Sequence, residues 1–451
     1  MKQPTREDVL RALPDAVRPL IEALLDAARK MDRAVYLVGG PVRDFLLERP
    51  IRDVDLLLDD RVGTDAKART QTFDGWVRSA LPRARITLHS RFRTLRIECE
   101  GAVLDVASAR RESYPHAGAL PSTEPGALEE DLRRRDFTVN ALALPLSPAA
   151  RRAHPHVTIV DPASGCADLQ RRVLRVFHPR SFHDDPTRAL RAARFAVGLG
   201  FRLQRATRTA LRNAIRDGAF GRVSGERYRR EIEKLFADSH LGLDPAAALR
   251  LLQDWHVLGA LEPGLEVPST AWTPLRRLGR IGLTPPWPLP ELRFWLAGLL
   301  VWLTPLRAAL RRRTLARLAV RGVLFQCCVG FAQREAQVRR GLQRTRGRGA
   351  VDALLGGFSA EEIIALYVGA EASARRRIAR YVREDRGRAT PLTGTDLTSL
   401  GFAGPEIGHA LARVRAAFLD GWVKSREDAL ALVRELAHKP PHRSERTRRQ
   451  A

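Results

Sequence analysis

The stretch "YLVGGPVRDFLLERPIRDVDLLLDD", residues 36–60, constrains the fold of this chain more than any other part of the sequence. An apolar run, a Gly-Gly turn and a short helical pattern precede a second apolar run, which carries Asp53 and Asp55. Residues i and i+2 of a strand face the same side, so both carboxylates should project from one face. Because adjacent carboxylates repel each other, the pattern predicts a cation between them.

The expected cation is magnesium, because hard oxygen ligands select it. Asp105, in the apolar run "AVLDVAS", belongs to a predicted neighbouring strand and can supply a third oxygen. Such carboxylates can hold two magnesium ions about 3.5–4 Å apart, which activates a hydroxyl and stabilises a leaving pyrophosphate. The Asp-x-Asp pair alone fits equally well a solvated strand end with incidental acids.

The glycine turn before this strand resembles a phosphate site. Gly39 and Gly40 should leave backbone N–H groups open at the start of the helix "PVRDFLL", and Arg43 should point a guanidinium into the same space. A P-loop is excluded because no Gly-Lys-Ser/Thr follows, and a dinucleotide fold is excluded because Gly-x-Gly-x-x-Gly is absent.

The order of the patterns predicts an α+β fold, with a small mixed-sheet head followed by a long all-helical body. Residues 9–31 have the spacing of one amphipathic helix, and no strand is expected from Asp168 onward. Further expected elements are strands over "AVYLV" and "RDVDLLL", a helix over 67–80, strands over 93–98 and 102–107, and a mobile loop over 110–128.

The charge balance points to a polyanionic partner. The 77 Lys and Arg residues against 51 Asp and Glu give a net charge of +26 and a pI near 11.2, which favours nucleic acid. DNA, RNA and the ribosome remain open on charge alone. The arginine-rich stretch 311–322 is either a solvated helix face or an RNA contact. The basic tail 439–451 is expected to be disordered.

Targeting signals and cysteine patterns add exclusions. The apolar run 294–303 has about half the length of a bilayer-spanning helix, so a core helix is expected. The first residues lack the apolar region of a secretory signal, and we expect a cytoplasmic protein without a membrane partner. The four cysteines form no Cys-x-x-Cys pattern, so neither zinc nor disulfides are expected.

Five motifs occur in an order that is found in one family: "LVGGPVRDFLL" with "RDVD", "LEEDLRRRDFTVNALAL", "DPASGCADL", "FHDDPTRALRAARFAVGLGF" and "VSGERYRREIEKLF". Over residues 36–236 the chain resembles the bacterial tRNA nucleotidyltransferase and poly(A) polymerase family. The segment "LTGTDLTSLGFAGPEIGHAL" resembles the tail of the tRNA-specific members. The resemblance implies a polymerase-beta-like head over 1–148, a base-selecting neck over 149–245, a tRNA-binding body and tail over 246–438, and a basic end over 439–451.

The resemblance also implies roles for residues of the head. Asp53 and Asp55 would bind magnesium, with Asp105 as the further catalytic carboxylate. Gly39, Gly40 and Arg43 would hold the nucleotide phosphates. Arg135 would contact the nucleotide, and Asp136 and Asn140, if helical, would share a face and read the ribose 2′-hydroxyl. A structural Arg-Asp pair that braces the sheet is the alternative for this second group.

The segment "DDPTRALRAARF" would select the base. Asp184 or Asp185 would cap a helix that starts at Pro186, which places Asp185, Arg188 and Arg191 on one face. A carboxylate beside a guanidinium accepts the amino group of cytosine or adenine, whereas uracil and guanine would place two acceptors face to face. A solvated helix face is the alternative. Most family members begin this motif with glutamate, where this chain has aspartate.

The expected function is template-independent addition of C, A or both to the 3′ end of tRNA, from CTP and ATP with magnesium. The expected partner is tRNA, through its 3′ end and acceptor arm, without an obligatory protein partner. A poly(A) polymerase shares every head motif, and an inactive tRNA-binding protein is the alternative from another class. The retained aspartates argue against the inactive protein.

Overall fold

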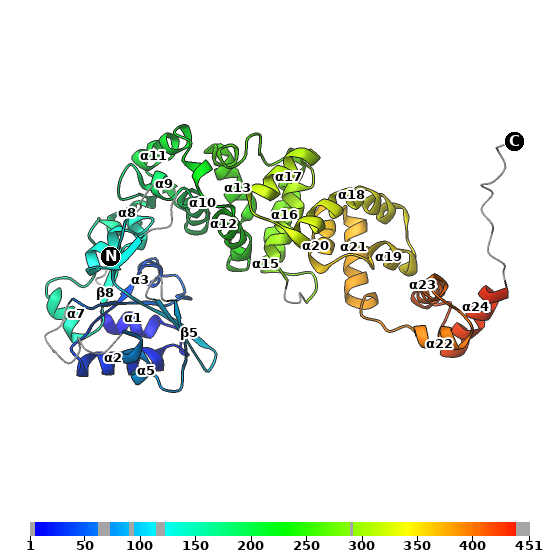
Figure 1. The fold of residues 1–451 in the computed structure, drawn as a ribbon, viewed down its shortest axis with the longest axis horizontal. Helices are drawn as coiled ribbons and strands as arrows, with labels where there is room; N and C mark the ends of the chain where they lie inside the picture. The colour runs from blue at the N-terminus through cyan, green and yellow to red at the C-terminus, as the bar shows by residue number, and fades with distance from the viewer. Residues whose placement is uncertain (1–4, 62–72, 90–93, 114–121, 289–291, 439–451) are drawn as a thin grey trace. The chain divides into compact units, whose positions relative to one another are not determined.

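A computed structural model describes residues 5–61, 73–89, 94–113, 122–288 and 292–438. The chain packs into two units, and Figure 1 shows strands and helices in the first and helices throughout the second. The first unit comprises Met1–Glu231 with Leu251–Pro263, and the second comprises Ile232–Arg250 with Gly264–Ala451. The division into head, neck and body remains a proposal, and the predicted disordered tail lies outside the described residues.

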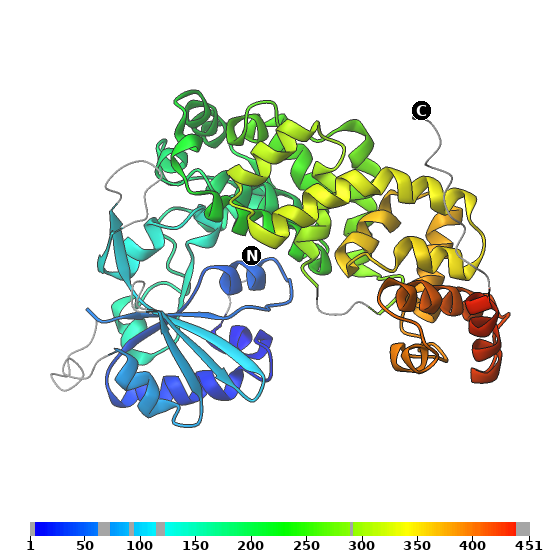
Figure 2. The same cartoon turned by 45° about the vertical axis from the view of Figure 1, so that its right-hand side comes forward.

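The first unit is built on a six-stranded sheet in the order β3-β4-β5-β2-β1-β8, visible as the fan of blue and cyan strands in Figure 2. Strands β2 and β5 pair in parallel, while the other pairs are antiparallel, which confirms the predicted mixed sheet. The strands are β1 (Ala34–Val38), β2 (Asp55–Asp59), β3 (Arg85–His89), β4 (Thr94–Cys99), β5 (Ala102–Ser108) and β8 (Ala143–Pro145).

The central position of β1 explains its composition. Every residue of "AVYLV" is buried, because β1 is paired on both edges and covered on its faces. Strand β5 is also paired on both edges, with β4 and β2, but alternates between buried and more exposed positions. Helix α2 (Arg18–Lys30) packs against β1 and against α5 (Phe73–Ala80), and α7 (Pro148–Ala153) packs against β1 and β8.

The rest of the first unit is mainly helical. Short strand pairs are formed by β6 (Arg110–Ser113) with β7 (Ser122–Pro125), and by β9 (Val173–Leu174) with β10 (Arg202–Leu203). Its further helices are α1 (Arg6–Ala12), α3 (Gly40–Leu46), α6 (Leu128–Arg133), the 3₁₀ helix η2 (Thr138–Asn140), α8 (Gly165–Arg171), α9 (Ser181–Asp184), α10 (Arg188–Leu199), α11 (Arg205–Arg216), η3 (Ala219–Arg222), α12 (Gly225–Ala237), which continues into the second unit, and α14 (Val257–Leu261).

Several local expectations were wrong. The single helix expected over residues 9–31 is two helices, because Pro14 forces Leu13 into an extended conformation and ends α1. The loop expected over 110–128 contains β6 and β7, and its residues 114–121 lie outside the described ranges. Strands β3 and β8 were not expected, and the short β9 and β10 lie beyond Asp168.

All the described secondary-structure elements of the second unit are helices. Leu296–Leu303 are all buried, which confirms the predicted core helix, and none of the described helices is long and apolar enough to cross a membrane. Its helices are η4 (Asp238–Leu241), α13 (Pro245–Asp254), η5 (Ser269–Ala271), α15 (Trp272–Leu283), α16 (Phe294–Leu303), α17 (Ala308–Arg317), α18 (Gly322–Arg344), α19 (Arg348–Leu355), α20 (Ala360–Gly369), α21 (Ala372–Arg380), the π-helix η6 (Tyr381–Asp385), α22 (Gly394–Ser399), α23 (Pro405–Leu419) and α24 (Arg426–His438).

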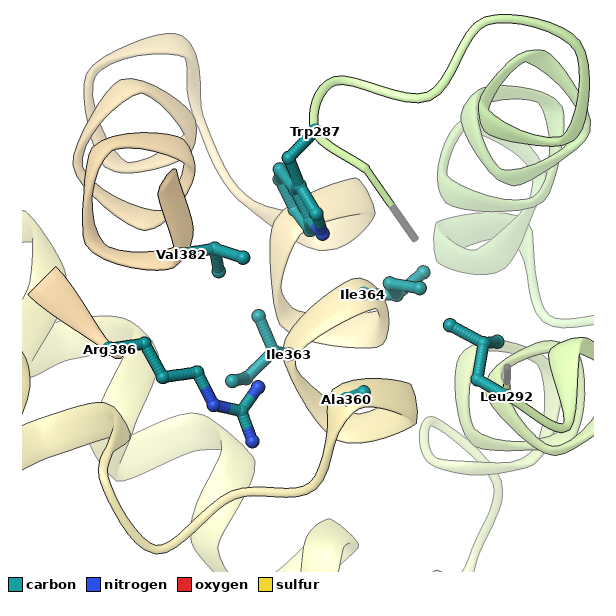
Figure 3. Close-up of a pocket in the computed structure, with 7 residues that line it drawn as sticks. All are labelled: Trp287, Leu292, Ala360, Ile363, Ile364, Val382 and Arg386. Atoms are coloured by element: carbon teal, nitrogen blue, oxygen red, sulfur yellow. The ribbon is translucent and has the colours of Figure 1, made fainter. Parts of the chain in front are cut away.

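The second unit contains a mainly apolar pocket, shown in Figure 3. The guanidinium of its one charged lining residue, Arg386, donates to the carbonyl oxygen of Phe358 at 3.1 Å. None of the described residues that line this pocket carries a carboxylate. The lining residues are Trp287, Leu292, Ala360, Ile363, Ile364, Val382 and Arg386.

Candidate active site

Two of the predicted carboxylates lie side by side on adjacent strands. Asp55 begins β2 and is the register partner of Asp105 on the parallel strand β5. The backbone N–H of Asp105 donates to the carbonyl oxygen of Val54 at 3.3 Å, which fixes this register. Asp53 precedes β2 and is exposed, because β2 starts three residues later than the predicted strand "RDVDLLL".

The three carboxylates influence one another electrostatically. The pKa of Asp55 is raised to about 6, chiefly by burial and also by the charges of Asp105 and Asp53, while Arg135 opposes the shift. Burial also raises the pKa of Asp105, where Asp53 adds to the shift and Arg96 opposes it. This concentration of negative charge in a partly desolvated place is the electrostatic requirement for binding a cation.

The carboxylates do not form a closed metal cage. Across the described residues, no three His, Cys, Asp or Glu side chains converge closely enough to hold a metal ion. Arg96, the register partner of Asp105 on β4, instead places Nη1 3.7 Å from Asp105 Oδ2. Magnesium is commonly held by one or two carboxylates together with substrate phosphates, so the pair Asp53 and Asp55 fits such an ion.

The glycine turn differs from the expectation in one respect. The N–H of Gly39 is not open, because it donates to the carbonyl oxygen of Leu142 at 2.9 Å. Gly39 has φ +77, and a Cβ atom at this position would lie 2.5 Å from Nη1 of Arg135. Glycine is therefore required both for the backbone conformation and for the approach of this guanidinium. Gly40 starts α3, whose first N–H groups have no helical partner.

Arg43 is buried and held by two side chains. Its Nε and Nη2 donate to the two carboxylate oxygens of Asp44 at 2.8 and 2.9 Å, and its Nη1 donates to Asn140 Oδ1 at 2.6 Å. Arg135 pairs with Asp131 at 3.2 Å. Arg43, which was predicted to hold phosphates, and Arg135, which was predicted to contact the nucleotide, are thus both pre-oriented beside the turn.

A polar network continues from Asn140 to helix α10. Asn140 Nδ2 donates to Asp136 Oδ1 at 2.9 Å, and Arg191 donates to Asp136 Oδ2 at 2.7 and 2.8 Å. Burial alone would raise the pKa of Asp136, but Arg191 and the amide of Asn140 lower it to about 2. The predicted helix through Asp136 and Asn140 is wrong, since only Thr138–Asn140 forms a 3₁₀ turn, yet the two side chains meet as expected.

The segment that was predicted to select the base has a different local structure from the predicted one. Helix α10 starts at Arg188, and Asp185 Oδ1 accepts bonds from the N–H of Thr187 at 3.0 Å and from its hydroxyl at 2.6 Å. Arg227 Nη2 lies 2.8 Å from the same oxygen. Arg188 is buried and donates to the carbonyl oxygens of Ser181 and Arg134 at 3.4 and 3.0 Å.

Sequence reasoning missed four contributors to this site. Arg227 and Glu231 lie at i and i+4 of α12, within a quoted motif to which no role was given. Glu231 lies 3.5 Å from Nη1 of Arg191, so it supports the charge of that guanidinium. Arg96 and Phe195 carried no signal of their own, because their contacts come from other parts of the chain.

Comparison with known proteins tests this interpretation. Residues 35–175 match the family model of the poly(A) polymerase head domain. Residues 35–175 therefore carry the likeness to that family. The family resemblance read from the motifs is therefore confirmed.

Relatives extend the likeness beyond the head. An A-adding tRNA nucleotidyltransferase of Geobacter sulfurreducens is 31% identical over 93% of this chain and 47% of the relative. A CC-adding tRNA nucleotidyltransferase of Deinococcus radiodurans is 35% identical over 54% of this chain and 61% of the relative. The chain spans 47%, 57% and 28% of three A-adding relatives that it matches.

Solved structures confirm the predicted fold class. An apo CCA-adding enzyme aligns with a TM-score of 0.74 and 24% identity, covering 96% of this chain and 99% of the other. The CCA-adding enzyme of Thermotoga maritima, complexed with tRNA, aligns with a TM-score of 0.69 and 25% identity, covering 96% and 99%. The small mixed-sheet head and the long helical body are thus a known combination.

Proposed function

We propose that this protein is a template-independent nucleotidyltransferase that adds C, A or both to the 3′ end of tRNA, using CTP and ATP and releasing pyrophosphate. The observation that carries the proposal is the pairing of Asp55 with Asp105 beside the glycine turn and Arg43. Relatives named for A addition and for CC addition support the substrate class.

We assign metal binding to Asp53 and Asp55, on the exposed side of the three carboxylates. Enzymes of this family are generally metal-dependent, and magnesium fits the all-oxygen donor set of Asp53 and Asp55. A bound magnesium ion would lower the pKa of the RNA 3′-hydroxyl and balance charge on the triphosphate. Asp105 would become a further metal ligand once the guanidinium of Arg96 moves away from its carboxylate. Positioning and electrostatics supply the remaining rate enhancement.

The chain's own groups orient the nucleotide. Arg43, Arg135 and the first N–H groups of α3 would hold the phosphates. Asn140 uses one amide hydrogen on Asp136 and accepts from Arg43, which leaves its second hydrogen for the ribose 2′-hydroxyl. Asp136 then acts by orienting Asn140.

Base selection is assigned to Asp185. Thr187 and Arg227 both engage Oδ1, so Oδ2 is left as an acceptor for the exocyclic amino group of cytosine or adenine. Arg188 has donors beyond the two that bind carbonyl oxygens, and it would face the neighbouring ring nitrogen. Arg191 would hold Asp136 and thereby link the base site to the ribose site.

The helical body is assigned to tRNA. Residues 292–334 contain eight arginines and not one Asp or Glu. Arg307, Arg312 and Arg321 are exposed at the ends and on the surface of α17 and at the start of α18. Folded RNA is recognised largely through its phosphates and shape, which suits these side chains.

The decisive experiment supplies purified protein and magnesium with tRNAs that end before CCA, after C and after CC. Each nucleoside triphosphate is offered singly and in mixture. Addition of C, A or both to the matching tRNA supports the proposal and identifies the product. Long adenosine tracts on any RNA would indicate a poly(A) polymerase, and tRNA binding without extension would indicate an inactive tRNA-binding protein.

A further inference from the structure

Phe195, a partly buried residue of α10, lies among three guanidinium groups. The Cζ atoms of Arg43, Arg191 and Arg194 lie 5.4, 5.4 and 5.1 Å from the centroid of its ring. Two of these arginines belong to α10 itself, whereas Arg43 comes from α3, far away in the sequence. A cation over an aromatic ring within about 6 Å is attracted by the negative face of the ring.

The surroundings make an aromatic ring more suitable here than an aliphatic side chain. Asp44, Asp136 and Glu231 pair with the three guanidinium groups and balance their charge. Phe137 packs edge-on against Phe195, with centroids 6.1 Å apart and the planes at 86°. A leucine would fill a similar volume, but it has no quadrupole to attract the cations.

We propose that Phe195 is a positioning residue that holds Arg43 and Arg191 at a fixed separation for one bound nucleotide. Arg43 serves the phosphate end of that nucleotide, and Arg191 serves the ribose and base end through Asp136. Phe195 acts through the arginines and itself contacts neither metal nor RNA. This inference rests on the proposed function, because it assumes that both arginines orient a nucleoside triphosphate.

The test replaces Phe195 in the full-length protein with phenylalanines that carry one, two or three ring fluorines. Fluorination weakens the negative face of the ring and changes its shape little. The dissociation constants of non-hydrolysable ATP and CTP analogues are measured together with the melting temperature. Nucleotide binding should weaken stepwise, reaching about threefold to thirtyfold for the trifluorinated ring, while the melting temperature changes little.

The control is the same fluorinated series at Phe182, a fully buried ring of α9. Fluorination there should leave the dissociation constants of both analogues unchanged. Phe195→Leu should weaken binding at least as much as trifluorination, and Phe195→Tyr should bind as the wild type does. Flat binding across the Phe195 series, with normal wild-type binding, would overturn this inference and leave the proposed function standing. A wild-type protein that binds neither analogue would overturn both.

Discussion

Two groups of arginines, one from each unit, contrast sharply. In the first unit, Arg43 and Arg191 are locked by carboxylates, amides and an aromatic ring. In the second unit, Arg307 and Arg321 are exposed within a stretch that has no acidic residue. The same side chain is thus held in place by several partners at the candidate site, and in the proposed function it serves as an exposed counter-ion for phosphate on α17 and α18. The difference lies in the partners supplied by the fold.

The largest effect should come from the carboxylates around which the first unit is arranged. Asp53→Ala and Asp55→Ala should each lower nucleotide addition by at least about 10³-fold, because the loss of a metal ligand removes several kcal/mol of transition-state stabilisation. Single-turnover rates check this, and tRNA affinity should stay near normal. Asp26→Asn, which changes a partly exposed acid on α2, is the matched control. Near-normal turnover of either site variant would place the metal elsewhere.

The next largest effect should be the loss of stability when the ion pair between Asp136 and Arg191 is removed. Asp136→Ala should destabilise the protein by about 3–5 kcal/mol, because it leaves the guanidinium of Arg191 buried without its main carboxylate. Denaturant unfolding of the two proteins at pH 7 measures the difference. An unchanged free energy of unfolding would mean that the stability of the fold does not depend on the ion pair between Arg191 and Asp136.

The pH dependence of stability tests the same ion pair between Asp136 and Arg191. The pKa of Asp136 is lowered from 3.8 to about 2, so its stabilisation is present above about pH 4 and is lost as the pH falls toward 2. Wild type should lose roughly 2 kcal/mol across this window through this group alone. Asp136→Asn should remove that part of the pH dependence, and identical slopes for both proteins would contradict the prediction.

Base selection should show an intermediate effect. Asp185→Ala should admit U or G and reduce the preference for C and A by about 5- to 150-fold, since each mispaired contact costs about 1–3 kcal/mol. Incorporation of the four nucleotides in competition measures this preference. Arg188→Ala should relax selection as well and also lower stability, because Arg188 braces two carbonyl oxygens. A slower enzyme with an unchanged preference among the four nucleotides would mean that α10 has a structural role only.

The smallest individual effects should come from the exposed arginines. Replacing Arg307, Arg312 or Arg321 with glutamine should weaken tRNA binding a few-fold each. The slope of log K against log salt should fall by about 0.7–0.9 for each phosphate that the protein no longer neutralises. Arg334→Gln, on the same α18 but paired with Glu362, is the matched control and should leave that slope unchanged. Equal affinity for folded tRNA and unstructured oligo(A) would favour a poly(A) polymerase.

Prediction from sequence succeeded where the signal was local. The apolar strand that carries Asp55 and the glycine turn before Arg43 are read from neighbouring residues, because strand and turn geometry repeat over two to four positions. It failed where a partner came from far along the chain. The bond from Gly39 to Leu142, which closes an N–H expected to be open, is one example. The ion pair between Arg96 and Asp105 depends on a β-register that the local pattern leaves undefined.

The sequence by itself determined the family of the head, the mixed sheet with its helical body and the acidic pair at the start of β2. Hydrophobic periodicity and turn chemistry act within a few residues, so they can be read directly. Only the tertiary structure decided that Arg191 holds Asp136 and that Thr187 and Arg227 both engage Oδ1 of Asp185. It also gathered three arginines around Phe195. The physical reason is that a charged side chain takes the partner that packing brings within hydrogen-bond distance, whatever their separation in the chain.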